Sequence, residues 1–457
     1  FSTIFFFTFY GVFAMHKLVE KRKFEPEDVL FLLLNSFIYY GIGFATFSEY
    51  SPAERFNGLF TLGNAFIHFG VALSIYRMKL ADRNLFHLVS GLVLVFLTIA
   101  IPVQLDGHWV TLIWAAEAAL LYWIGRSRQV GFYEILSYPL MGLAVLSQVQ
   151  DWGGLGTPAT YIIYSNGLKP VFNSGFLIGL MVCFAFGFMV FTAKKYPTAI
   201  LNPVMKKSPP YAHFFGNILP PAAFILLLYF TFRQEWINLW LERYSSRYTN
   251  STIDNFNFYP PGAPALVLLR VWLLNYTSVF LALWGFIMLK LTTQKSSGNV
   301  FFILSALTLL LTASLGNIWL GELRDATINP EQNGFSITRA TAISIRYISF
   351  ACTGLLLMAL FQIKKRMLPA PKYAEMAFDL LLHLNLLFAI TGEMITWLKI
   401  NQFAQFDKLG LSIFWGVYSL LLIGLGIFRK KQHLRIGAIV LFGITLIKLF
   451  FYDIANL

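Results

Sequence analysis

The acidic residue with the most unusual setting in this sequence is Glu117, which lies inside an apolar stretch. Trp114, Ala115 and Ala116 precede it, and apolar residues follow it as far as Leu120. An ionised carboxylate placed in hydrocarbon costs several kcal/mol. Glu117 therefore needs a partner on another helix, a water-filled cavity or a general-base role that explains its presence. We treat it as the first candidate catalytic residue.

A short polar turn directly before this apolar stretch holds further candidates. Asp106 and His108 are separated by one glycine, and Trp109 follows them. An aspartate and a histidine together can move protons, although this spacing is a weak signal by itself. Asp106 and His108 join the candidate catalytic residues, and Trp109 and Trp114 are candidate ligand-binding aromatic residues.

The composition indicates an integral membrane protein. Hydrophobic residues make up 57% of the 457 residues and charged residues 12%, which is too apolar for an ordinary soluble domain. The apolar runs are about 20 residues long, which is typical of transmembrane helices and not of outer-membrane strands. The net charge of +13 does not indicate nucleic-acid binding, because the basic residues lie between the apolar runs with no nucleic-acid-binding motif around them.

The fold class that we predict is all-α, a polytopic transmembrane bundle of about 14 spanning helices built from successive hairpins. Residues 1–457 are expected to form a single polytopic domain, and the apolar start at Phe1 indicates a portion of a longer chain. The expected segments are 1–16, 28–48, 57–76, 84–102, 109–125, 132–149, 173–193, 214–231, 263–289, 298–320, 340–362, 374–398, 409–428 and 433–452.

The loops alternate in charge. Loops after the odd-numbered segments hold 23 of the 35 basic residues, so the positive-inside rule makes them cytoplasmic and the others external. The external loops include the long ones, 150–172, 232–262 and 321–339. Within 232–262, Trp236 and Trp240 recur at helical spacing opposite charged residues, which predicts an interfacial helix.

Charged residues embedded in the predicted helices gather in the outer half of the membrane. They are Glu117, Arg270, Arg346, Glu393, Lys448 and Asp453. Three interpretations stay open. In the first, these residues are structural ion pairs or snorkelling anchors. In the second, they line a polar vestibule whose cations hold an anionic lipid or a pyrophosphate-linked glycan beside a catalytic Glu117 or Glu393, and in the third they line a transport path. The last ranks third, because the inner half holds little beyond Asp379, His383 and Asn385 and no internal repeat is evident.

Other chemistry lacks a sequence signal. There is no HExxH, Walker or GxSxG motif, and neither the seven histidines nor the two cysteines show metal-ligand spacing. We expect no metal and no intrinsic cofactor.

Several stretches resemble the large domain-of-unknown-function family 2339 of predicted bacterial multi-pass membrane proteins. They are AIPVQLDGHWVTLIWAAEAALLYWIGR, NGLFTLGNAFIHFGVALSIYRMKLADRNLF, LLLNSFIYYGIGF and LRIGAIVLFGITLIKLFFYDIANL, with the resemblance strongest around Pro102, Trp109, Trp114, Glu117, Arg435, Lys448 and Asp453. The resemblance implies a bacterial inner-membrane protein without an established activity, and it supplies no catalytic residue.

The function that we expect is the binding or processing of a lipid or lipid-linked envelope glycan at an outward-facing vestibule. Arg270, Arg346, Lys448, Asp453, Trp109 and Trp114 are the expected ligand-binding residues. A non-enzymatic scaffold or assembly subunit is the alternative, and a transporter or flippase is a less favoured one. The expected partners are membrane lipid, a lipid-linked glycan and other envelope membrane proteins, and no nucleic acid.

The orientation can be tested with single cysteines in intact cells. We expect Ser127→Cys and Lys206→Cys to be shielded from a membrane-impermeant thiol reagent, and Thr157→Cys and Asn333→Cys to react. The opposite pattern at two of the four positions would invert the topology and contradict the external vestibule.

Overall fold

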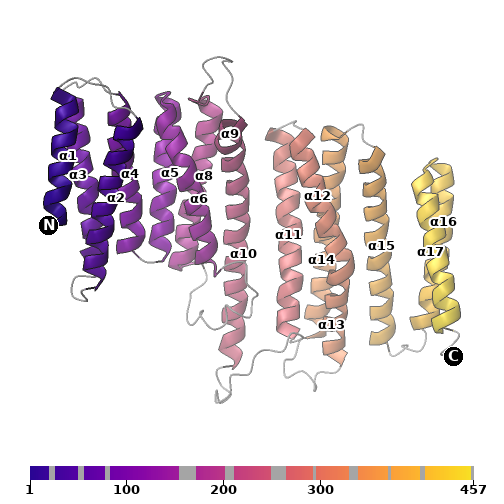
Figure 1. Cartoon of the computed structure of the whole chain (residues 1–457). Coiled ribbons are helices and arrows are strands. Elements are labelled where there is room, and N and C mark those ends of the chain that lie inside the picture. Colours follow the sequence, from indigo (N-terminus) through magenta and orange to yellow (C-terminus); the bar gives the residue numbers. More distant parts are fainter. Residues whose placement is uncertain are drawn as a thin grey trace. The chain divides into compact units, whose positions relative to one another are not determined.

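The computed structural model describes residues 1–19, 26–49, 56–77, 83–105, 107–153, 171–200, 210–248, 264–291, 295–328, 338–368, 372–401 and 407–453. Within these ranges the regular structure is helical, and each predicted apolar segment falls on a helix or on a run of joined helices (Figure 1). The elements are α1 (Ser2–Val19), α2 (Pro26–Glu49), α3 (Asn57–Arg77), α4 (Arg83–Gln104), α5 (His108–Ser127), α6 (Gly131–Asp151), α8 (Ser174–Lys195), α9 (Pro210–His213), η2 (Phe214–Ile218), α10 (Leu219–Tyr248), α11 (Pro264–Leu291), α12 (Lys295–Leu311), η3 (Thr312–Gly316), α13 (Asn317–Ile328), α14 (Arg339–Met367), α15 (Lys372–Ile400), α16 (Asp407–Phe428), α17 (Gln432–Lys448) and η6 (Leu449–Asp453).

Length and apolar composition allow some of these helices to cross a membrane. Among the described residues, nine helices or joined helices are long and apolar enough to cross a bilayer. Large side chains on their surfaces are exposed, as with Phe184 at 77% and Ile439 at 64%, because lipid can cover them. The all-α membrane fold is therefore confirmed, and the number of about 14 crossings stays a prediction.

The chain divides into two compact units, residues Phe1–Glu235 and Trp236–Leu457. In the first unit, α5 packs against α6 and α8, and Tyr122, Met141 and Phe186 are fully buried in their shared core. In the second unit, Phe301 and Leu356 are fully buried where α11, α12, α14 and α15 contribute to one core. The expectation of one domain over 1–457 stays a prediction.

The separate interfacial helix expected in 232–262 is not what the described residues form. Residues up to Tyr248 continue α10 without a break, and residues 249–263 lie outside the described part. No proline or glycine interrupts the chain between Ala222 and Tyr248. The described part of this region therefore belongs to the last turns of a longer helix, and an interfacial helix is not confirmed.

In the described part of the chain, the π-helical turns η2 and η3 lie between α-helical segments, and η6 follows α17. The first has a visible cause, since Pro220 and Pro221 follow it and lack backbone N–H groups. They cannot donate to the Gly216 carbonyl from positions i+4 and i+5. The Tyr122 hydroxyl of α5 donates to that carbonyl instead, so a side chain from another helix satisfies the backbone group that the prolines leave free.

Close packing of α5 on α6 requires a glycine at position 125. A Cβ on Gly125 would lie 2.5 Å from the backbone nitrogen of Glu134, whereas a Cβ on Gly142 in α6 would meet nothing within 4 Å. We expect Gly125→Ala to lower the free energy of unfolding by about 1–3 kcal/mol, because the helices must separate. Gly142→Ala is the matched control and should stabilise slightly through helix propensity. Equal thermal unfolding midpoints for both variants in detergent would contradict this packing.

Candidate functional site

The first candidate region lies where α4 meets α5. Pro102 lies inside α4 and lacks an N–H, so the carbonyl of Thr98, four residues earlier, has no helical donor. The indole Nε1–H of Trp114 donates to this carbonyl at 3.2 Å. Trp114 therefore fixes α5 against α4 at the level of Thr98.

Glu117 lies one turn after Trp114 and meets the same residue of α4. The Thr98 Oγ1 is 3.2 Å from Oε1 and 3.3 Å from Oε2 of Glu117. Glu117 is partly buried, and the neighbouring Ala116 and Leu120 are exposed on the helix surface. Among the residues that the structure describes, Glu117 forms no ion pair, so its described polar contact is with a hydroxyl group.

His108 pairs with a different aspartate from the one that its spacing suggested. Its Nδ1 lies 3.3 Å from Oδ2 of Asp151, at the end of α6, whereas Asp106 lies outside the described residues. The hydroxyl of Thr111 donates to the same Asp151 oxygen at 2.5 Å. Interaction with this carboxylate raises the pKa of His108 above its ordinary value, against partial burial, which lowers it.

A second candidate region lies in the Trp236–Leu457 unit, where α13, α14 and α15 meet. Arg346 is 3% exposed, and its Nη1 lies 3.8 Å from Oε2 of Glu393. Its Nη2 donates to the carbonyl of Leu320 at 3.3 Å. Neither Nη1 of Arg346 nor Oε2 of Glu393 has a hydrogen-bond partner among the described residues. The two charges are therefore held near each other without direct hydrogen bonding.

Two exposed aromatic residues hold the other oxygen of Glu393. The hydroxyl of Tyr347 and the indole N–H of Trp397 each donate to Oε1 at 2.7 Å. Tyr347 is 47% exposed and Trp397 is 49% exposed, while Glu393 is 25% exposed. Glu393 thus lies between a buried guanidinium group and an accessible aromatic surface.

A small cavity lies around η3, and its lining includes Leu320, whose carbonyl accepts from Arg346. Its volume is about 40 Å³, above the roughly 10–15 Å³ that one water needs. Asn317 and Leu320 belong to its lining, and the Oδ1 of Asn317 has no hydrogen-bond partner among the described residues. A Cβ on Gly392 would lie 3.0 Å from that atom and 3.4 Å from Nη1 of Arg346. The close approach of both polar atoms to α15 therefore depends on glycine at 392.

The other expected ligand-binding residues have separate neighbours. Arg270 of α11 lies over the ring of Trp319 at 5.8 Å, and Lys448 donates to the Ser412 hydroxyl at 2.9 Å. Trp109 is 58% exposed, and the side chain of Asp453 lies outside the description. The structure brings Arg346 and Glu393 together; the convergence of Arg270, Arg346 and Lys448 on one anion stays a prediction.

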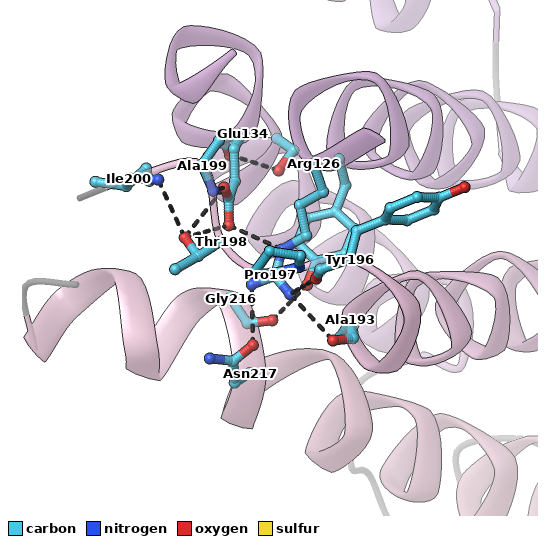
Figure 2. A network of polar contacts seen from close by, with 12 residues as sticks. Arg126, Glu134, Ala193, Tyr196, Pro197, Thr198, Ala199, Ile200, Gly216 and Asn217 are labelled. Atoms are coloured by element: carbon cyan, nitrogen blue, oxygen red, sulfur yellow. Dashed lines mark hydrogen bonds and ion pairs between the residues drawn. The ribbon is translucent and has the colours of Figure 1, made fainter. Parts of the chain in front are cut away.

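A buried polar network in the described part of the first unit was not expected from the sequence. The expected segment 109–125 leaves Arg126 in the basic loop that follows it, but Arg126 and Glu134 are both fully buried and pair at 2.9 Å (Figure 2). Arg126 also donates to Asn217 of η2 at 2.9 Å, and Glu134 accepts from the hydroxyl of Thr198 and the N–H of Ala199. The turn RSRQVGFYE, with an arginine and a glutamate facing across it, was the available signal.

A further cluster joins α15 to the start of α17. Lys431 Nζ lies 2.6 Å from Asp379 and 2.9 Å from Glu375, and His433 Nε2 lies 2.8 Å from Asp379. The sequence had singled out Asp379 without these partners. Because Lys431 and His433 belong to the loop and first turn that follow α16, their pairing with α15 was not visible in the local spacing.

Comparison with known proteins places the chain in a family. A family model described as "Predicted membrane protein (DUF2339)" matches residues 2–457. The chain belongs to this family. No curated protein and no solved structure matches it. Family membership thus agrees with the membrane fold and gives no activity, so the DUF2339 chain has to be interpreted from its own side chains.

The His108–Asp151 pair should make stability depend on pH. The pKa of His108 is higher in the folded state than its ordinary value of 6.5 in the unfolded state. The ion pair therefore stabilises the fold fully at a pH below the unfolded-state pKa, and this stabilisation is lost as the pH rises through the folded-state pKa. We expect His108→Gln to lower the thermal unfolding midpoint at pH 5.5–6 and to have little effect above about pH 8. His213→Gln, at an exposed histidine that ends α9, is the control. A pH-independent effect of His108→Gln would contradict the ion pair.

Proposed function

We propose that this membrane protein binds the hydroxyl-bearing headgroup of a lipid or lipid-linked glycan at Arg346 and Glu393. The observation that supports the proposal is the pair of unpartnered atoms, Nη1 of Arg346 and Oε2 of Glu393, held 3.8 Å apart. Leaving buried polar atoms without hydrogen bonds costs about 1–3 kcal/mol each. A group that donates to Glu393 and accepts from Arg346 would remove both costs.

A hydroxyl group meets this requirement better than a phosphate. Its hydrogen can go to the carboxylate oxygen while its lone pairs accept from the guanidinium group. A phosphate would also meet Arg346, but its oxygens would face the negative charge of Glu393. One cation beside one carboxylate gives an approximately neutral site, so the geometry favours a neutral polar ligand.

The aromatic surface beside Glu393 supports a sugar or similar headgroup. Tyr347 and Trp397 fix one carboxylate oxygen and leave their rings about half exposed. Such rings offer an apolar surface with a polar edge, and Trp and Tyr are typical of the level where lipid headgroups meet hydrocarbon. We place this site on the external side of a bacterial inner membrane, following the charge pattern of the loops.

The proposal can be tested by thermal unfolding in nanodiscs of phosphatidylethanolamine with one added lipid. We expect a glucosyl diacylglycerol to raise the unfolding midpoint by roughly 1–3 °C, and phosphatidic acid, which offers phosphate without a headgroup hydroxyl, to have a smaller effect. Trp397→Phe should remove the glycolipid effect, because it removes one donor that positions Glu393. Trp123→Phe, at an exposed tryptophan of α5, is the matched control.

Three outcomes would contradict this assignment in different ways. An equal or larger rise with phosphatidic acid that Trp397→Phe removes would make the ligand a phosphate. An effect that survives Trp397→Phe would place the binding site elsewhere. The absence of any lipid effect in wild type would favour a scaffold whose polar pair is structural.

A further inference from the structure

The hydrogen bond between Thr98 of α4 and Glu117 of α5 needs a donor hydrogen from one of the two side chains. A hydroxyl group carries one hydrogen and can accept two hydrogen bonds. The Oγ1 of Thr98 lies 2.8 Å from the Leu94 carbonyl, 3.2 Å from Oε1 of Glu117 and 3.3 Å from Oε2. The shortest contact assigns the single hydrogen to Leu94. The lone pairs of Thr98 then face Glu117, and a hydrogen must come from the glutamate.

The charged groups on the elements around Glu117 do not supply a cation to it. On α4, residues 89–104 contain no ionisable side chain. On α5, His108 and Arg126 are each nine positions away, roughly 13 Å along the helix. His108 is paired with Asp151 and Arg126 with Glu134. These two carboxylates are the acidic groups of α6, so both of them already have a basic partner.

The remaining titratable groups on the packed helices are neutral or distant. On α5 and α6 they are the tyrosines 122, 133 and 138, and on α8 they are Cys183 and the terminal Lys194 and Lys195. Tyr122 donates to Gly216 and Tyr138 donates to Glu134. Among the described residues, therefore, nothing compensates a negative charge on Glu117.

The position of Glu117 on α5 makes such a charge costly. The exposed side chains of Ala116 and Leu120 show that this part of the helix surface faces the surroundings of the unit. In a membrane those surroundings are lipid, which cannot solvate a carboxylate. The indole N–H of Trp114 donates to the Thr98 carbonyl at 3.2 Å and therefore does not donate to Glu117.

We infer that Glu117 is a neutral carboxylic acid that donates its hydrogen to Thr98, and that it forms a proton-binding site inside the membrane. The hydrogen bonds run from Glu117 to the Thr98 hydroxyl and from that hydroxyl to the Leu94 carbonyl. Glu393 is the opposite case, since it accepts from Tyr347 and Trp397 and faces Arg346. Glu117 and Glu393 thus have opposite hydrogen-bond arrangements.

A neutral carboxyl group in a membrane has a characteristic reactivity toward apolar carbodiimides. In the reaction with dicyclohexylcarbodiimide, the carboxyl oxygen bonds to the central carbon while the carboxyl hydrogen moves to one nitrogen, and one carbon–nitrogen double bond becomes single. Rearrangement of this adduct transfers the acyl group to nitrogen, so the residue gains the full mass of the reagent. An ionised carboxylate lacks the required hydrogen.

The experiment is to treat the full chain in native membranes with dicyclohexylcarbodiimide over a range of pH and to locate the adduct by peptide mass spectrometry. We expect Glu117 to be modified several-fold more than Glu393, with a yield that falls as pH rises. Glu393 is the internal comparator in the same membrane. No adduct at Glu117 at any pH, or an equal yield at Glu393, would overturn the inference.

Stability gives a second measurement that does not depend on access of the reagent. Glu117→Gln replaces a neutral acid by a neutral amide and should leave the thermal unfolding midpoint nearly unchanged. Glu393→Gln is the matched control and should lower the midpoint clearly, because the buried Arg346 loses its counter-charge. An equal fall for both variants would mean that Glu117 is ionised and paired. The glycolipid result at Arg346 and Glu393 is independent of this outcome.

Discussion

Backbone groups inside a bilayer must find their hydrogen-bond partners within the protein, and proline makes this difficult at two places around α5. Pro102 leaves the Thr98 carbonyl without a helical donor, and Pro220 with Pro221 leaves the Gly216 carbonyl without one. Trp114 and Tyr122 of α5 donate to these two carbonyls. The helix is thereby fixed to α4 at one level and to η2 at another. Aromatic side chains with a polar edge suit this task, because they bury apolar area and still carry a donor.

The two Arg–Glu pairs found among the described residues differ in how many hydrogen bonds their polar atoms form. Arg126 and Glu134 are fully buried, lie 2.9 Å apart and have further partners on neighbouring segments. Their network therefore connects these segments and has a structural role. Arg346 and Glu393 lie 3.8 Å apart, and each retains an atom without a partner among the described residues. A network whose polar atoms all have partners within the protein leaves no hydrogen bond for a ligand to form. A network with unpartnered polar atoms beside exposed aromatic rings can still bind one. This contrast is the reason for placing the candidate site in the second unit.

The sequence predicted the helices well and their side-chain partners poorly. Apolar runs near 20 residues are a local signal, so each expected segment appears as a helix. Charge counting put Arg126 in a loop, because a sum of charges does not say whether an arginine turns inward. Asp106 was expected beside His108 because it lies two residues away in the sequence, whereas Asp151 belongs to another helix. Pro102, Trp114 and Glu117 were recognised, but Thr98 was not, since a threonine in an apolar helix carries no signal until the facing helix is known.

Glu117 and Glu393 show how the same residue type can have different hydrogen-bond arrangements in one protein. A carboxyl group in hydrocarbon either receives enough donors to hold its charge or keeps its hydrogen. Glu393 receives a hydroxyl and an indole on one oxygen and faces a guanidinium with the other. Glu117 meets one hydroxyl group whose hydrogen is directed elsewhere. Binding of a polar headgroup needs the first arrangement, and uptake or release of a proton needs the second. The chemistry of each acid in this chain therefore depends on the donors that surround its carboxyl group.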